Sequence, residues 1–118
     1  MTEMIVVKSK IKELAGDCNV AGDFAEALNA VAVELVTKAA ARAEANNRKT
    51  VQAKDVYVGE ITAETMVVVK SKVKNVVEGA NVAGNFGEAL NEMLAWCIMQ
   101  AAARAEANGR KTIGARDL

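Results

Sequence analysis

The 118-residue chain contains no histidine and no proline, and it has only two cysteines and 3% aromatic residues. The absence of histidine removes the most common general base, the most common zinc ligand and every histidine-dependent nucleophile, so the sequence favours a protein that is not an enzyme. Two thiols without histidine cannot complete an ordinary four-ligand zinc site. We therefore expect neither a metal nor a cofactor.

Long apolar runs and an excess of charge are also missing. No apolar stretch approaches the roughly 18 residues that span a bilayer, and the chain begins without the layout of a signal peptide. We therefore expect a soluble cytoplasmic protein with no membrane partner, in which Cys18 and Cys97 are unpaired thiols. Fifteen basic residues balance fifteen acidic ones, which argues against a polycationic tail but permits a local basic face. The abundant residues, alanine, valine, glutamate and lysine, are typical of helices.

The chain repeats itself with an offset of 62 residues. Residues 1–56 (the first half) align without a gap on residues 63–118 (the second half), 29 of the 56 pairs are identical, and residues 57–62 form a connector. The longest identical stretch, 39–46 against 101–108, is followed in both halves by Arg-Lys-Thr. A unit of this size buries too little apolar surface to be stable alone, so we expect the two halves to share one core.

Each half predicts the same series of helices. Apolar spacing predicts a first helix over 5–15 and 67–77. Asp23 and Asn85, each followed three residues later by glutamate, predict a capping box at the start of a second helix of about 23 residues. Leu28, Val31 and Leu35 form its predicted apolar stripe, and it ends at 46–47 or 108–109. A third helical turn is predicted at 53–56 and 115–118, which makes the fold class all-α.

This order of elements, with Arg-Lys-Thr in the last loop and Ala-x-Asp opening the third helix, resembles the histone fold. The resemblance is strongest to the small bacterial-type histones, whose third helix is truncated. It implies two tandem histone folds clasped in an intramolecular handshake pseudo-dimer, a histone doublet. The implied function is that of a nucleoid-associated architectural protein that binds double-stranded DNA without reading its sequence. The alternative is a histone-fold scaffold for other proteins that contacts DNA little.

The resemblance also implies roles for particular residues. It pairs Arg48 with Asp55 and Arg110 with Asp117, and it turns the Arg-Lys-Thr loops toward DNA phosphates, together with the lysines of the first helices. The basic residues gather in these same segments, whereas six of the fifteen acids lie along the long helices: Glu26, Glu34, Glu44, Glu88, Glu92 and Glu106. A purely structural role for the two arginines and a merely solvated first helix are the alternatives. The first loops, residues 16–20 and 78–82, contain no lysine or arginine, whereas many histones place an arginine there for the minor groove, so we expect no insertion into the minor groove. The candidate DNA-contacting residues are Lys8, Lys10, Lys12, Arg48, Lys49, Thr50, Lys70, Lys72, Lys74, Arg110, Lys111 and Thr112.

The halves diverge most at 30–38 against 92–100, in the middle of the long helices. There Met93, Trp96 and Met99 stand where the first half has smaller or polar residues. In one interpretation these large side chains fill the core opposite alanines and valines of the first half. In the other they form an exposed patch through which doublets associate with one another. We favour the first.

Overall fold

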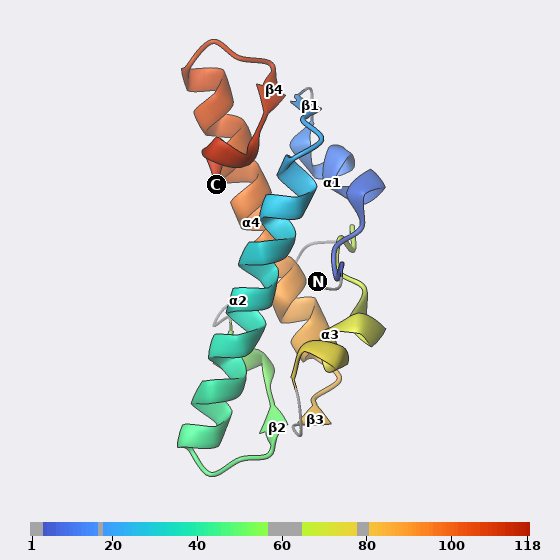
Figure 1. Ribbon diagram of the computed structural model, residues 1–118, viewed down its shortest axis with the longest axis vertical. Coiled ribbons are helices and arrows are strands. Elements are labelled where there is room, and N and C mark those ends of the chain that lie inside the picture. The colour runs from blue at the N-terminus through green and yellow to red at the C-terminus, as the bar shows by residue number, and fades with distance from the viewer. Residues whose placement is uncertain (1–3, 17, 57–64, 78–80) are drawn as a thin grey trace.

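Two long helices of 22 residues each form the centre of the protein. The computed structural model describes residues 4–16, 18–56, 65–77 and 81–118. Helices α2 (Phe24–Ala45) and α4 (Phe86–Ala107) run antiparallel and cross, within a molecule whose longest extent is 47 Å (Figure 1). In the described ranges, no helix combines the length and the apolar character that crossing a membrane requires. The connector, residues 57–62, lies outside the described residues, as does part of each first loop.

The first helices are shorter than predicted. Helix α1 spans Lys8–Ala15 and α3 spans Lys70–Val76, and both lie on the same side of the long helices (Figure 1). The residues just before them are extended, and they join the two halves: the Val7 amide donates to the Val67 carbonyl and the Val69 amide to the Ile5 carbonyl, both at 2.7 Å. The segments 5–7 and 67–69 consist of isoleucine and valine, which favour an extended backbone, and this explains why the helices begin later than predicted.

Four short strands connect each half to the other. Strand β1 (Asn19–Val20) pairs in parallel with β4 (Thr112–Ile113), and β2 (Thr50–Val51) pairs in parallel with β3 (Asn81–Val82). Each pair takes one strand from each half. The third elements are single turns of 3-10 helix, η1 (Ala53–Asp55) and η2 (Ala115–Asp117), rather than full helices. The loops of the first half are therefore shaped by the second half, and the reverse.

The predicted apolar stripe of the second helix is only partly correct. Leu28 is fully buried, but Val31 and Leu35 are only half-buried. After Leu28, the buried face of α2 consists mostly of small residues, because alanines allow two helix backbones to approach closely where they cross. The fully buried Leu94 and Ile98 of α4 stand at the positions of smaller residues in α2. The buried face of α2 is Phe24, Ala25, Leu28, Asn29, Ala32, Val36, Ala39 and Ala43.

The sequence predicts correctly where the long helices end, but not how their first residues are capped. The Arg48 amide donates back to Ala43, and the Asn47 amide to Glu44, which is a Schellman ending. Asn47 has φ 60° and Gly109, at the same place in the second half, has φ 69°. The predicted capping boxes are wrong: Asp23 and Asn85 have helical backbones and make no side-chain cap hydrogen bond. Asp23 instead accepts a hydrogen bond from the Ala115 amide of the other half, at 3.4 Å.

Two buried asparagines hold the extended segments against the long helices. Asn29 Oδ1 accepts from the Ile5 amide and Asn91 Oδ1 from the Val67 amide, each at 2.7 Å. The Asn91 side-chain amide also donates to the Thr65 carbonyl at 2.9 Å. Both asparagines are 3% exposed or less. They therefore fix where α1 and α3 begin relative to α2 and α4.

Candidate nucleic-acid interface

Two Arg-Lys-Thr loops lie at opposite ends of the molecule, each beside the first loop of the other half (Figure 1). At one end the Asn19 amide donates to the Lys111 carbonyl at 2.6 Å, and at the other the Asn81 amide donates to the Lys49 carbonyl at 2.7 Å. The backbones of both lysines are thus held by strand pairing. Both lysine side chains are exposed. Thr112 is exposed as well, whereas Thr50 is half-buried.

An arginine fixes the shape of each loop from inside. Arg48 contacts both carboxylate oxygens of Asp55, at 2.9 and 2.7 Å, and Arg110 contacts those of Asp117 at 2.9 and 2.6 Å. The carboxylates are 4% and 2% exposed. Hydrogen bonds from these guanidinium groups lower the pKa of Asp55 and of Asp117, although burial acts in the opposite direction. Most of the hydrogen-bonding capacity of both arginines is therefore directed inward.

The sequence interpretation missed a second arginine in each half. Arg42 donates to the backbone carbonyl of Asp55, and Arg104 donates to that of Asp117. Both arginines lie in the longest identical stretch of the repeat, which was the available signal. They hold the third element against the end of the long helix. Asp55 and Asp117 are therefore each held through the carboxylate by one arginine and through the backbone carbonyl by another.

The lysines of the first helices are exposed but not equivalent. Lys8, Lys10 and Lys12 lie on α1, where Lys10 approaches Glu13 at 3.7 Å. On α3, Lys70 forms an ion pair with Glu88 at 2.9 Å. Lys70 can lie there because Gly87 has no side chain; a Cβ at that position would stand 2.7 Å from the Lys70 side chain. The first half has alanine at the matching position, and within the described ranges Lys8 makes no corresponding ion pair. The described lysines of α3 are Lys70, Lys72 and Lys74.

A groove runs between each first helix and the loop that follows it. The groove of the first half has a volume of about 460 Å³ and that of the second half about 390 Å³. Each is bordered by two lysines and a serine of the first helix on one side, and on the other by the short strand and the alanine and glycine that follow it. The polar residues that line them include Lys8, Ser9, Lys12 and Asn19 in one groove and Lys70, Ser71 and Lys74 in the other.

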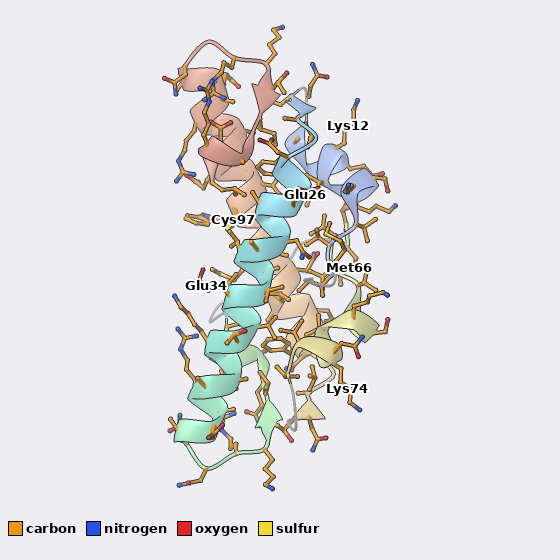
Figure 2. All side chains as sticks on the ribbon, in the orientation of Figure 1. Lys12, Glu26, Glu34, Met66, Lys74 and Cys97 are labelled. Carbon is orange, nitrogen blue, oxygen red and sulfur yellow. The ribbon has the colours of Figure 1, made fainter. Side chains whose placement is uncertain are left out.

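Most of the other glutamates on the long helices are exposed. The two sides of the pair of long helices carry different charged residues. Figure 2 shows Lys12 and Lys74 on one side of the two long helices and Glu34 and Cys97 on the opposite side. Glu34 forms an exposed ion pair with Lys38 at 3.0 Å. The lysines of α1 and α3 therefore lie on one side of the long helices, here called the lysine-bearing side, and the Glu34–Lys38 ion pair lies on the other.

The interpretation of Trp96 and Met99 as core residues is wrong. Trp96 is 56% exposed and Met99 is 58% exposed, whereas Met93 is half-buried. The large residues that enter the core from this segment are Leu94 and Ile98 instead. Trp96 and Met99 belong to the opposite face of α4, so the alternative interpretation, an exposed patch, describes them.

Among the described residues, no cluster of potential metal ligands is present.

Comparison with known proteins identifies the fold. No family model matches the sequence, and no curated protein matches it. A solved structure of the histone from Methanopyrus kandleri is similar, with a TM-score of 0.60 and 16% sequence identity, over 95% of this chain and 89% of that chain. At this identity the likeness establishes the fold alone. The chain has a mostly helical, histone-like fold.

Proposed function

We propose that the protein is a tandem histone doublet that binds double-stranded DNA through its phosphates, without reading base sequence, in the nucleoid. In this proposal residues 1–56 and 63–118 are two histone folds that clasp each other as an intramolecular pseudo-dimer. The crossing of α2 and α4 and the two strand pairs between halves support it. The single-turn third elements support the bacterial type. The likeness to an archaeal histone extends over both halves, since it covers 95% of the chain.

One observation carries the proposal: the lysine-bearing loops lie at the two ends of the molecule, with the lysines of α1 and α3 between them (Figure 1). A 22-residue helix is about 33 Å long, and one turn of DNA is about 34–36 Å. Loops separated by the length of such a helix can therefore contact phosphates on the same face of a duplex, about one turn apart. The lysines of the first helices then contact the phosphates between these two points.

The contacts have different roles in this proposal. Lys49 and Lys111 contact phosphates directly, because their backbones are fixed and their side chains are exposed. Thr50 and Thr112 are additional phosphate donors in the same loops. Arg48 and Arg110 hold the loops in shape through their aspartates and contribute to binding by positioning. Neither lysine nor threonine distinguishes bases when it contacts phosphate, so binding is independent of sequence.

The balanced charge makes the expected binding weak and sensitive to salt. Six to eight phosphate contacts give a slope of about −5 to −7 in a plot of log affinity against log salt concentration. Lys70 contributes less than Lys8, because the Glu88 carboxylate must be displaced or shared when a phosphate approaches.

Fluorescence anisotropy on random-sequence duplex DNA across a salt series tests the proposal. Lys49→Gln and Lys111→Gln should each weaken binding and reduce the salt slope by about 0.9. Lys38→Gln is the matched control, because it removes the same charge on the opposite side and introduces the glutamine that the second half has at that position. It should leave the slope unchanged. Equal effects of all three variants would contradict the assignment of the loops, and no binding at low salt would favour a protein-binding scaffold.

A further inference from the structure

The exposed pair Trp96 and Met99, here called the α4 patch, is not required by the fold. The repeat supplies the comparison, since the same positions of α2 carry Glu34 and Thr37. The first half thus forms the same helix, crossing and loops with polar residues there. The second half instead exposes more than half of a tryptophan and of a methionine to solvent. Exposed large apolar side chains grouped on one face mark contact surfaces.

The α4 patch lies on the side away from the proposed DNA contacts. Glu34, its counterpart in α2, and Cys97, its neighbour in α4, both lie opposite Lys12 and Lys74 (Figure 2). Because the two halves repeat the same elements about the crossing of α2 and α4, Trp96 occupies the same side as Glu34. A molecule bound to DNA through its lysines would therefore leave this patch uncovered.

We propose that the α4 patch binds the α4 patch of a second copy of this chain, back to back, so that a pair of molecules holds two DNA duplexes together. This inference rests on the proposed function. Among the described residues each chain carries one such patch, and two identical patches related by a twofold axis form a closed contact. At the corresponding positions of α2 the charged residues are Glu34 and Lys38, whose ion pair is neutral, and α4 itself carries Glu92 one turn before Trp96. The net charge of this side is therefore small, so two copies can approach on it. The lysine-bearing sides would repel each other.

The size of the patch indicates when the contact forms. Trp96 and Met99 together expose on the order of 200 Å², whereas a stable interface buries about 800 Å² per partner. The contact is therefore too small to hold two molecules together in dilute solution. Several molecules bound along one duplex present several patches at once to a second coated duplex, so one contact holds the other patches near their partners and the weak contacts form together. Association should consequently depend on DNA.

A bridging assay tests the inference. One random-sequence duplex is immobilised, a second carries a fluorophore, and recovery of the second measures bridging, while anisotropy measures binding to a single duplex. Trp96→Glu/Met99→Thr installs the residues of the first half, so the substituted helix has a counterpart that already folds. This variant should bridge at least about tenfold less, equivalent to about 1.4 kcal/mol, and bind a single duplex as the wild type does.

The outcomes separate the two proposals. Undiminished bridging by the variant, or a wild type that binds a single duplex but bridges none, overturns the back-to-back contact alone. A wild type that does not bind a single duplex overturns the proposed function and this inference together.

The fluorescence of Trp96 gives a second, direct measurement, because it is the only tryptophan in the chain. Its emission maximum should move to shorter wavelength when protein is added to DNA at saturating density, as the indole leaves water. Met99→Thr, which keeps the tryptophan, should reduce this shift. An emission maximum that stays at the position of the free protein overturns the contact.

Discussion

Replacing Asn91 by alanine should lower the free energy of unfolding by about 2–4 kcal/mol. The substitution leaves the buried Val67 amide without its acceptor at 2.7 Å, which costs about 1–3 kcal/mol. The small cavity left by the side chain adds about 1 kcal/mol. For a chain of this length the total stability is about 6–18 kcal/mol, so the loss is a large share of it.

Urea unfolding followed by far-UV circular dichroism at neutral pH measures this loss. Asn108→Ala is the matched control, because the Asn108 side chain makes a 2.8 Å hydrogen bond to Arg104 but is exposed. It should cost about 0.5 kcal/mol, near the lower end for a solvent-exposed hydrogen bond. If Asn91→Ala costs no more than this control, the buried asparagine does not anchor the extended segment and the reasoning is wrong.

The double variant Asn29→Ala/Asn91→Ala tests whether the two anchors act together. The segments that they hold are hydrogen-bonded to each other through Val69 and Ile5. Loosening one segment should weaken the other, so the two losses should differ from their sum by about 0.5 kcal/mol or more. Strict additivity would indicate that the two halves are held independently at this junction.

Three other measurements follow from the structure. The pKa values of Asp55 and Asp117 are lower in the folded protein than in the unfolded chain. Both aspartates therefore stabilise the fold above about pH 5, and this stabilisation is lost as the pH falls through the folded pKa values. In a variant with asparagine at both positions, the urea concentration at the unfolding midpoint should fall less steeply as the pH is lowered. Gly109→Ala should cost about 1–2 kcal/mol, because Gly109 has φ 69°, whereas Gly114→Ala, at φ −126°, should cost less than about 0.5 kcal/mol in the same urea assay. Burial raises the pKa of the Cys97 thiol, so iodoacetamide should alkylate it more slowly at neutral pH than it alkylates free cysteine, as mass spectrometry would show.

The repeat is the reason that much of the fold was predictable. Because the same pattern occurs twice at one spacing, the two long helices, their C-terminal ends and the short third turns can be placed from sequence. The predicted first helices are too long, because the helical spacing includes Val7 and Val69, whereas the segments 5–7 and 67–69 are extended and hydrogen-bond to each other. A contact between residues far apart in sequence decided that conformation, and periodicity within one segment does not reveal it.

The errors at the helix starts and in the core have similar causes. Asp23 has the sequence of a cap, but its carboxylate accepts from Ala115, which lies in the other half. The predicted stripe contains Val31 and Leu35, because hydropathy favours large apolar side chains, whereas the crossing of the two helices buries the small Ala32 instead. The same preference assigned Trp96 to the interior. In each case the neighbouring helix or loop, absent from a local pattern, determined the outcome.

The pairing of β1 with β4 has a consequence for biosynthesis. Asn19 leaves the ribosome long before Thr112, its partner in the strand pair, has been translated. The first loop must therefore stay open while nearly all of the chain is made, and the interlocked ends can close only afterwards. We expect ribosome-bound chains that stop before residue 112 to remain sensitive to protease within residues 19–23, and those extended past η2, with enough added linker to clear the exit tunnel, to become resistant there.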